Sequence, residues 1–587
     1  MCKVLDRINT PKDLKVLSRN ELVQLCGEIR EQMLLRLSLT GGHVGSNLAI
    51  IEATVALHYV FDSPADKIIF DVSHQCYTHK LLTGRKAAYT DPARFFSVSG
   101  FTNPSESEHD IFSIGHTSTA ISLACGLAKG RDVKGENHNV IALVGDGALS
   151  GGEAFEGLNN AAALGSNIIL IINDNDMSIA KNHGGLYQNL KLLRETDGKA
   201  ACNLFRALGF DYAFVHDGND FGEIAEALEK VKDTNHPVVI HMCTVKGKGY
   251  SFAEDDKENW HYMGPFHMAT GKLKTESIPV ETYEALTAAY LADKMRKDAT
   301  ITAVTAGTPK VLGFEEELRK QFPKQFVDVG IAEGHAVAFV SGIAKAGGNP
   351  VFGVSSSFLQ RAYDQLSSDL ALNHSPAVIL VFFAGINEGS QTHMGIFDIS
   401  LAANIPNIIY LAPTCKEEYF SMLEWGLNQT ESPVIIRVPG VETVSRVAAL
   451  LPEYSYPAKY EIVKQGTAVA ILALGKFFEL GERVREKLEA EHGIHATLIN
   501  PRYASALDET MLNALPEYGH KLVVTLEDGV IDGGFGEKVA RFYGTLPIKV
   551  LSFGAKKEFV NHVTVEEQYS RYRLTPEQIV SDILNEI

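Results

Sequence analysis

Short runs of apolar, largely β-branched residues recur along this chain, and stretches compatible with helix separate them. Strands that are apolar throughout, rather than at alternate positions, are typical of parallel sheets that helices cover on both faces. The recurrence therefore predicts an α/β fold built from doubly wound, mostly parallel sheets. We expect strands at residues 139–144, 167–172, 237–244, 377–383, 407–411, 467–474 and 521–526.

Two segments interrupt this alternation and indicate where domains meet. Residues 253–281 are polar and rich in turn-forming residues, so we read them as a long linker. Residues 439–466 separate the strand PVIIRV from the strand TAVAILAL. A chain of 587 residues is long enough for several domains. We predict three doubly wound α/β domains, which span residues 1–265, 266–445 and 446–587.

The charge balance bears on what the protein binds. Acidic side chains number 72 against 54 basic ones, which gives a net charge of -18 and disfavours nucleic acid and anionic membranes as partners. The first residues, MCKVLDRINTPKDL, lack the apolar run of a signal peptide, and no apolar stretch is long enough to span a bilayer. We therefore expect a cytoplasmic protein whose partners are small molecules.

The strongest local signal is the motif VIALVGDGAL, followed by NIILIINDNDMS. Asp146 emerges between two glycines at the carboxyl end of a buried strand, where α/β folds bind ligands, and Asn175 follows the next strand. One carboxylate, one amide oxygen and a main-chain carbonyl at Met177 could hold Mg²⁺ together with diphosphate oxygens. The first motif alone fits an ordinary turn equally well. The second motif at this spacing favours the metal site.

This pair of motifs resembles the signature of thiamine diphosphate (ThDP) proteins. Other segments narrow the resemblance to the 1-deoxy-D-xylulose-5-phosphate synthase family of the transketolase superfamily, and they cover nearly the whole chain: GGHVGSNL, DVSHQCYTHKLLTGR, SIGHTSTAISLACGLA, VKGKGYSFAE, IAEGHAVAF, FLQRAYDQ and GGFGEKVA. The resemblance implies three domains of transketolase type, ThDP and Mg²⁺ as cofactors, and a place in isoprenoid biosynthesis. It also implies a homodimer with each active site between the first and second domains of one chain.

The resemblance assigns catalytic roles to individual residues. Glu333 is the candidate for the acid that activates the aminopyrimidine of ThDP, and apolar neighbours would help to keep it protonated. An isolated glutamate at that place could equally serve the helix dipole. Phe358 matches the aromatic residue that stacks on the pyrimidine. His43, His261 and His393 match active-site histidines, which can move protons near neutral pH.

Contacts to the diphosphate end follow from the same resemblance. Backbone amides, a hydroxyl group, imidazoles and an ammonium group can all serve phosphate oxygens. A lysine in VKGKGY would otherwise be an exposed basic residue. Besides Asp146 and Asn175, the implied cofactor-binding residues are His74, Gly115, His116, Thr117, Gly147, Ala148, Lys246 and Tyr250.

The substrate end departs from the family pattern. Phe383, in FFAG, stands where the family motif DRAG has its arginine, and VPG at 438–440 lacks the arginine of the family motif PRG. Both family arginines are associated with the phosphate of the acceptor. Ser355 replaces a family tyrosine and Pro104 a family arginine, whereas Arg361 is retained as a candidate substrate-binding residue.

We therefore expect a ThDP-dependent transferase that decarboxylates pyruvate and transfers the two-carbon unit to an aldehyde such as glyceraldehyde 3-phosphate. The missing arginines favour a different acceptor, and they leave the donor open. One alternative is ketol transfer from a ketose donor, as in transketolase. The other is a catalytically silent paralogue that binds ThDP, although the retained Glu333 argues against it.

Overall fold

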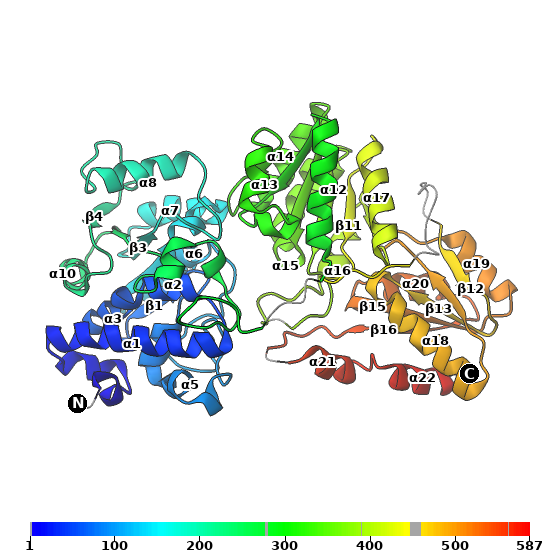
Figure 1. The fold of residues 1–587 in the computed structure, drawn as a ribbon, viewed down its shortest axis with the longest axis horizontal. Coiled ribbons are helices and arrows are strands. Elements are labelled where there is room, and N and C mark those ends of the chain that lie inside the picture. The colour runs from blue at the N-terminus through cyan, green and yellow to red at the C-terminus, as the bar shows by residue number, and fades with distance from the viewer. Residues whose placement is uncertain (1–2, 276–279, 389, 447–458, 562) are drawn as a thin grey trace. The chain divides into compact units, whose positions relative to one another are not determined.

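Three β-sheets follow one another along the chain, each with its own helices (Figure 1). The structure is a computed structural model, and it describes residues 3–275, 280–388, 390–446, 459–561 and 563–587. The chain divides into two units. Unit 1 contains residues 1–278 and 330–332, and unit 2 contains residues 279–329 and 333–587. Unit 1 carries the first sheet, and unit 2 carries the second and third sheets.

The sheet of unit 1 has five parallel strands in the order β1-β2-β3-β5-β4. Gly145 pairs with Asn173 across β2 and β3, so the segments that follow these two strands begin side by side. The strands are β1 (Lys67–Phe70), β2 (Val140–Gly145), β3 (Ile169–Asp174), β4 (Asp211–Val215) and β5 (Val238–Cys243). The helices are α1 (Arg19–Thr40), α2 (Val44–Ala49), α3 (Ile51–Val60), α4 (Tyr77–Lys80), α5 (Ala87–Thr90), α6 (Ala120–Lys134), α7 (Gly152–Ala163), α8 (Gly185–Glu195), α9 (Leu204–Leu208), α10 (Phe221–Val231) and α11 (Ser251–Asp255).

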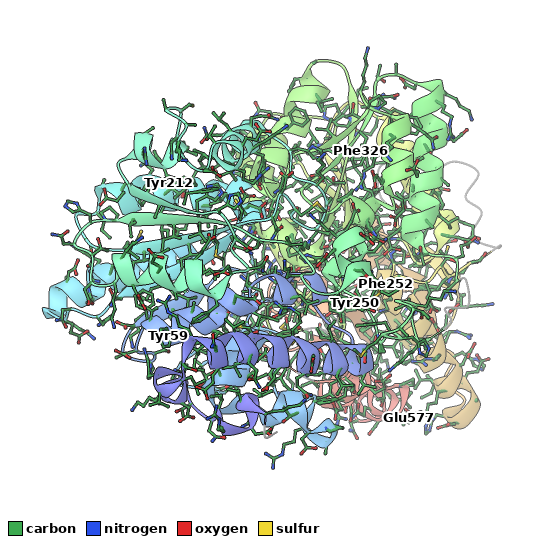
Figure 2. All side chains as sticks on the ribbon, turned by 60° about the vertical axis from the view of Figure 1, so that its left-hand side comes forward. Tyr59, Tyr212, Tyr250, Phe252, Phe326 and Glu577 are labelled. Carbon is green, nitrogen blue, oxygen red and sulfur yellow. The ribbon has the colours of Figure 1, made fainter. Side chains whose placement is uncertain are left out.

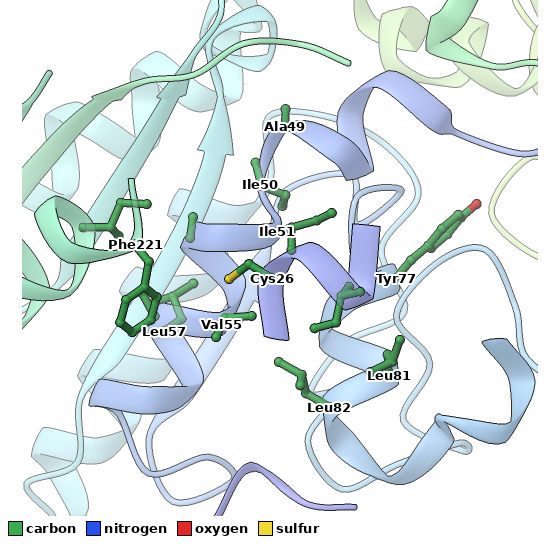
Figure 3. Packing of buried hydrophobic residues seen from close by; sticks show 14 of the residues in the cluster. Cys26, Ala49, Ile50, Ile51, Val55, Leu57, Tyr77, Leu81, Leu82 and Phe221 are labelled. Carbon is green, nitrogen blue, oxygen red and sulfur yellow. The ribbon is translucent and has the colours of Figure 1, made fainter. Parts of the chain in front are cut away.

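Both faces of this sheet are buried, as the apolar runs predict. Alternate residues of β2 belong to two different hydrophobic clusters: Leu143 packs into one, and Val144 into the other. Figure 3 shows the first cluster, where Cys26 of α1, Leu57 of α3 and Phe221 of α10 come together. Helices on both faces leave the carboxyl ends of the strands as the edge at which polar groups can gather.

The second sheet, in unit 2, has six parallel strands in the order β10-β11-β9-β8-β6-β7. Its strands are β6 (Ile301–Thr305), β7 (Phe326–Asp328), β8 (Asn349–Ser355), β9 (Val378–Phe382), β10 (Ile409–Leu411) and β11 (Val434–Arg437). Its helices are α12 (Tyr283–Lys297), α13 (Glu316–Gln321), α14 (Glu333–Lys345), α15 (Ser356–Leu359), α16 (Asp398–Ala402) and α17 (Lys416–Asn428).

The third sheet has five strands in the order β12-β14-β13-β15-β16, and β12 alone pairs antiparallel. Its strands are β12 (Glu461–Lys464), β13 (Val469–Ala473), β14 (Thr497–Asn500), β15 (Leu522–Val530) and β16 (Lys549–Ala555). Its helices are α18 (Phe478–His492), α19 (Glu509–Glu517), α20 (Phe535–Tyr543), α21 (Val565–Arg571) and α22 (Pro576–Leu584).

The mostly parallel α/β architecture with three sheets confirms the predicted fold class. Every strand that the apolar runs predict is present, within a few residues of the expected bounds. Among the helices that the structure describes, none combines the length and the hydropathy that crossing a membrane requires.

The stretch that we predict as a long linker is partly folded onto unit 1. Trp260 and Phe266 are buried in its core, and Met263 forms an isolated bridge with Gly42. Part of the second predicted boundary segment, 447–458, lies outside the described residues. The three-domain division therefore stays a prediction.

Candidate active site

The segments after β2 and β3 bring the predicted metal ligands together in unit 1. Asp146 directly follows β2 and is 1% exposed, and Asn175 directly follows β3. The backbone N–H of Met177 donates to Asp146 Oδ2 at 3.1 Å, and the side-chain amide of Asn182 donates to the same oxygen at 2.8 Å. The carboxylate, the amide and the Met177 backbone thus lie at one edge of the first sheet.

These groups fit a hard divalent cation. Asn175 Oδ1 is buried and accepts no hydrogen bond within the described part of the chain. Burial, and next the charge of Asp174, raise the pKa of Asp146 well above its usual range. A buried oxygen without a hydrogen bond, beside a buried carboxyl that forms no salt bridge within the described residues, favours a bound cation. Oxygen ligands are those that Mg²⁺ prefers. The residues present therefore suit Mg²⁺ bound with an anionic group.

Gly147 and Ala148 lie on a short 3-10 helix, η5 (Asp146–Ser150), beside the loop that follows β3. A Cβ atom on Gly147 would come within 2.4 Å of Ser178 Cβ, so a larger residue would push the two loops apart. Ser118 Oγ donates to the Ala148 carbonyl at 2.7 Å. This bond ties η5 to the segment that enters α6.

That segment carries the predicted diphosphate contacts Gly115, His116 and Thr117. It is anchored by Asp71, a buried residue immediately after β1. The two carboxylate oxygens of Asp71 accept from the backbone N–H groups of Ser118 at 2.8 Å and Ala120 at 3.0 Å. Residues 115–117 therefore directly precede a backbone segment that Asp71 holds beside η5.

Lys246 and Tyr250 are placed differently from each other. The Lys246 ammonium donates to the Ser178 carbonyl at 2.5 Å, and burial lowers its pKa to about 8. Lys246 therefore reaches the loop after β3. The hydroxyl of Tyr250, which Figure 2 labels, donates to the Met268 carbonyl at 3.0 Å. The Tyr250 ring packs against Trp260 in the core. A cofactor contact by Tyr250 stays a prediction.

Three predicted histidines form one cluster in unit 1. The ring centroids of His43 and His74 lie 4.9 Å apart, and His261 lies 5.6 Å from His43 and 5.2 Å from His74. They come from the start of α2, the loop after β1 and the predicted linker. Phe101 contacts the His43 ring edge-on at 5.9 Å. Burial lowers the pKa of His261 well below its usual value, so this imidazole is neutral.

In unit 2, Glu333 is the first residue of α14 and is only 4% exposed. Burial raises the pKa of its carboxyl group, and the Arg361 guanidinium, 3.7 Å from Glu333 Oε2, opposes that rise. The structure therefore holds Glu333 as a buried acid with a raised pKa. It also brings the retained Arg361 to this acid.

Phe358 and His393 form a second group in unit 2. Phe358 lies on α15, and its ring meets the His393 ring edge-on at 5.7 Å. His393 Nδ1 shares a hydrogen bond of 2.9 Å with the Thr392 hydroxyl. Burial lowers the pKa of His393 to about 4, which leaves the imidazole neutral at physiological pH.

The positions that depart from the family pattern offer little to a phosphate. Phe383 follows β9, is 43% exposed and has a positive φ of 54°. Arg437, at the end of β11 and two residues before the proline of VPG, is 3% exposed. Its guanidinium is paired with both Asp398 and Asp528, so it is already neutralised. It therefore cannot substitute for a missing phosphate-binding arginine.

Sequence reasoning missed the residues that surround Asp174. Asp174 accepts hydrogen bonds from Arg194 and His241, both of which are distant in sequence. Burial alone would raise the pKa of Asp174, but these hydrogen bonds outweigh it and lower the pKa. The available signal was His241 itself, a polar residue within the apolar run of β5.

Family models match successive parts of the chain. A family model described as 1-deoxy-D-xylulose-5-phosphate synthase matches residues 5–202 and 197–244. The transketolase pyrimidine binding domain matches residues 280–442, and the transketolase C-terminal domain matches residues 458–579. Three successive matches thus follow the three sheets.

Relatives match along the full length. The 1-deoxy-D-xylulose-5-phosphate synthase of Clostridium acetobutylicum is 38% identical and covers 100% of both chains. That of Caldanaerobacter subterraneus subsp. tengcongensis is 39% identical and covers 99% of both. Among solved structures, a transketolase from Leishmania mexicana is 16% identical, has a TM-score of 0.43 and covers 96% of both chains. On the strength of the two full-length relatives, this chain belongs to the 1-deoxy-D-xylulose-5-phosphate synthase family.

Proposed function

We propose that this chain is a ThDP- and Mg²⁺-dependent transferase that decarboxylates pyruvate and transfers the two-carbon unit to an aldehyde. Family membership implies dependence on ThDP and supports this class of reaction. The observation that carries the proposal is the buried Glu333 with its raised pKa. A protein that only binds ThDP needs no carboxylic acid held out of water, so the silent alternative is not favoured.

The residues of unit 1 would hold the charged end of the cofactor. Asp146, the Asn175 amide oxygen and the Met177 carbonyl would bind Mg²⁺, since these are the hard oxygen ligands that the ion takes. The close approach at Gly147 holds η5 beside the loop after β3, and backbone amides of these segments would bind diphosphate oxygens. Lys246, held at the loop after β3, would add a positive charge there.

The residues of unit 2 would transfer a proton and bind the aminopyrimidine ring of ThDP. Bound ThDP supplies a nucleophilic carbon and an electron sink for breaking a bond next to a carbonyl group. Glu333 would donate its proton to a ring nitrogen of the aminopyrimidine, and Phe358 would stack on that ring. The neutral His393, and His43 and His261 of unit 1, would exchange protons with the oxygen of the substrate carbonyl.

We further propose that the acceptor differs from a phosphorylated aldehyde bound by two arginines. Phe383 carries no charge, and the nearby Arg437 is neutralised by Asp398 and Asp528. A lost bidentate contact of this kind weakens binding by roughly tenfold or more. Arg361 remains as a cation for a carboxylate or a phosphate.

The proposal includes the organisation implied by the family. The domains would span residues 1–265, 266–445 and 446–587, and two chains would form a homodimer whose active sites each use the first and second domains of one chain. Light scattering that finds only monomer at micromolar concentration would contradict the dimer. The cytoplasmic location also stays a prediction.

A donor and acceptor matrix tests the reaction. Pyruvate and several ketoses are each paired with phosphorylated and unphosphorylated aldehydes, with ThDP and Mg²⁺ present, and carbon dioxide and product mass are measured. We expect carbon dioxide from pyruvate together with a product that is two carbons longer than the aldehyde. Ketose-dependent product without carbon dioxide would support transketolase-type transfer instead, and no product from any pair would support the silent paralogue.

The same matrix tests the acceptor separately. We expect kcat/KM for glyceraldehyde 3-phosphate to fall at least tenfold below that of a family member that has both arginines. Efficient formation of 1-deoxy-D-xylulose 5-phosphate would contradict the altered acceptor while leaving the reaction class intact.

A further inference from the structure

Asp174 is the last residue of β3 and directly precedes Asn175 of the proposed metal loop. Its buried carboxylate accepts hydrogen bonds from Arg194 of α8, whose Nη1 atom lies 2.7 Å from each carboxylate oxygen. The Nη2 atom of the same guanidinium lies 3.1 Å from Asp176. Arg194 therefore holds the residues on both sides of Asn175.

A second chain of hydrogen bonds reaches Asp174 from the neighbouring strands. His241 Nε2, on β5, lies 2.8 Å from Asp174 Oδ2. His241 Nδ1 lies 2.8 Å from the hydroxyl of Tyr212 on β4, and Figure 2 labels Tyr212. Because the His241 ring is fixed at both nitrogens, it cannot turn away from Asp174 without losing a buried bond.

The contacts of Asp174 stabilise an uncommon backbone conformation in the loop after β3. Asp176 has a positive φ of 59°, which is uncommon for a residue other than glycine. Its N–H donates to Asp174 Oδ1 at 3.2 Å, and the Met177 N–H that follows donates to Asp146. The position of the Asp174 carboxylate thus determines where the Asn175 oxygen and the Met177 carbonyl lie.

The charges around Asp146 and Asp174 also favour a cation at Asp146. Asp146 and Asp174 are both buried at the ends of adjacent strands. Arg194 compensates Asp174, whereas Asp146 accepts only neutral donors among its described hydrogen bonds. A divalent cation would consequently be drawn to Asp146 and not to its neighbour.

We propose that Arg194 and His241 are positioning residues, which act through Asp174 to hold the loop 175–177 in the conformation that binds Mg²⁺. This inference rests on the proposed function, because it concerns the same metal. Partners of this kind behind metal ligands typically change metal affinity by about 10-fold to 100-fold when they are removed. An ordinary structural ion pair would change the stability of the fold without changing that affinity.

The chain offers a matched control at the other end of the same strand. Arg131 of α6 is buried, pairs with Asp132 at 2.7 Å and donates to the carbonyl of Asn167 just before β3. Arg131→Gln therefore removes an arginine that anchors the amino end of β3, whereas Arg194→Gln removes a half-buried arginine that anchors the carboxyl end.

Calorimetric titration of Mg²⁺ into the full-length protein with ThDP present measures the effect. We expect the Mg²⁺ dissociation constant to rise at least tenfold in Arg194→Gln, to rise less in Arg194→Lys, and to stay within twofold of wild type in Arg131→Gln. Urea unfolding of each variant tests whether a loss of stability alone accounts for the change in the Mg²⁺ dissociation constant. If Arg194→Gln does not fold, Tyr212→Phe decides the question, with an expected rise of a few fold.

Two outcomes separate this inference from the proposed function. Wild-type Mg²⁺ affinity in the folded Arg194→Gln protein, or in Tyr212→Phe where it replaces that variant, would overturn the inference alone. A wild-type protein that binds no Mg²⁺ in the presence of ThDP would contradict the proposed function and this inference together.

Discussion

At the scale of single residues, burial gives ordinary side chains unusual protonation states. Burial raises the pKa of Glu333, whereas it lowers that of Lys246 to about 8 and that of His393 to about 4. Each shift favours the neutral form, because the low dielectric of the interior penalises charge. Burial thus moves the pKa values of Glu333 and Lys246 toward neutrality, which favours proton exchange, whereas it moves the pKa of His393 away from neutrality.

Glu333→Gln should retain ThDP but lose most proton transfer. The amide has nearly the same shape and cannot give up or take back the proton, and general acid–base catalysis contributes typically 10²-fold to 10⁴-fold. We expect proton–deuterium exchange at the thiazolium carbon of bound ThDP, measured by quenched-flow NMR, to slow by at least ~10²-fold.

A matched substitution separates this role from a simple effect at a helix terminus. Glu316 is also the first residue of a helix in unit 2, α13, but it is exposed. Glu316→Gln should leave the exchange rate unchanged. Unimpaired exchange in Glu333→Gln would exclude Glu333 as the proton donor.

Residue types in motifs were readable from the sequence, whereas their partners were not. Asp146, Asn175 and Glu333 stand in motifs with recognisable spacing. The pairing of Arg437 with Asp398 and Asp528, however, joins residues that are 39 and 91 positions apart. Such pairs depend on how strands and loops meet in three dimensions, so a single sequence gives no sign of them.

At the scale of secondary-structure elements, the site depends on two loops at the carboxyl ends of adjacent strands. The pairing of β2 with β3 starts η5 and the loop after β3 side by side. Gly147 then permits their close contact, because its missing side chain leaves room for Ser178.

Gly147→Ala should therefore separate the two loops and weaken cofactor binding. The added methyl group would lie 2.4 Å from Ser178 Cβ and 2.9 Å from Ser178 Cα, and neither atom belongs to a flexible side-chain end. We expect ThDP with Mg²⁺ to raise the melting temperature of the wild-type protein and to raise that of Gly147→Ala much less, as measured by scanning fluorimetry.

Gly152→Ala is the appropriate control, because a Cβ atom at Gly152 meets nothing within 4 Å. It lies on α7, a few residues further along the chain, and should respond to the ligands as the wild-type protein does. An equal response in Gly147→Ala would show that the close approach is not needed for binding.

The strands that the apolar runs predicted are largely buried. The runs missed some buried strands, such as β8 and β14, and they also missed strands that are short or partly solvated. β4 is half-buried, β7 has only three residues and β12 is an antiparallel edge strand with two exposed residues. Short or partly solvated strands lack the continuous apolar pattern that makes a buried parallel strand recognisable. Their neighbours in the sheet, and not their own sequences, determine their structure.

At the scale of the whole molecule, each unit contains one of the two tryptophans. Trp260 is buried in unit 1, and Trp425 lies on α17 of unit 2. A chain with two such units need not unfold in a single step. Trp425→Phe would leave Trp260 to report unit 1, and Trp260→Phe would leave Trp425 to report unit 2.

Unit 1 also contains a buried polar chain away from the proposed cofactor loops. Asp110 accepts from His79 Nε2 at 2.8 Å, so His79 Nδ1 accepts from His58 Nε2, also at 2.8 Å. The remaining nitrogen of His58, Nδ1, is buried and has no hydrogen-bond partner among the described residues. Burial, and next the charge of His79, lower the pKa of His58 well below 6.5.

This arrangement makes the stability of unit 1 sensitive to acid. His58 stays neutral in the folded protein, whereas in the unfolded chain it binds a proton as the pH falls through about 6.5, so acidification favours unfolding. Between pH 7.5 and 6.0, one such histidine lowers the free energy of unfolding by about 0.8 kcal/mol.

In His58→Gln the amide can still donate to His79, but it does not titrate. In the Trp425→Phe background, urea unfolding followed by Trp260 fluorescence should therefore show a smaller loss of stability over this pH range for His58→Gln, by about that amount. The Trp425 signal in the Trp260→Phe background should be unaffected by the substitution, and an equal pH dependence of unit 1 with and without His58 would contradict the prediction.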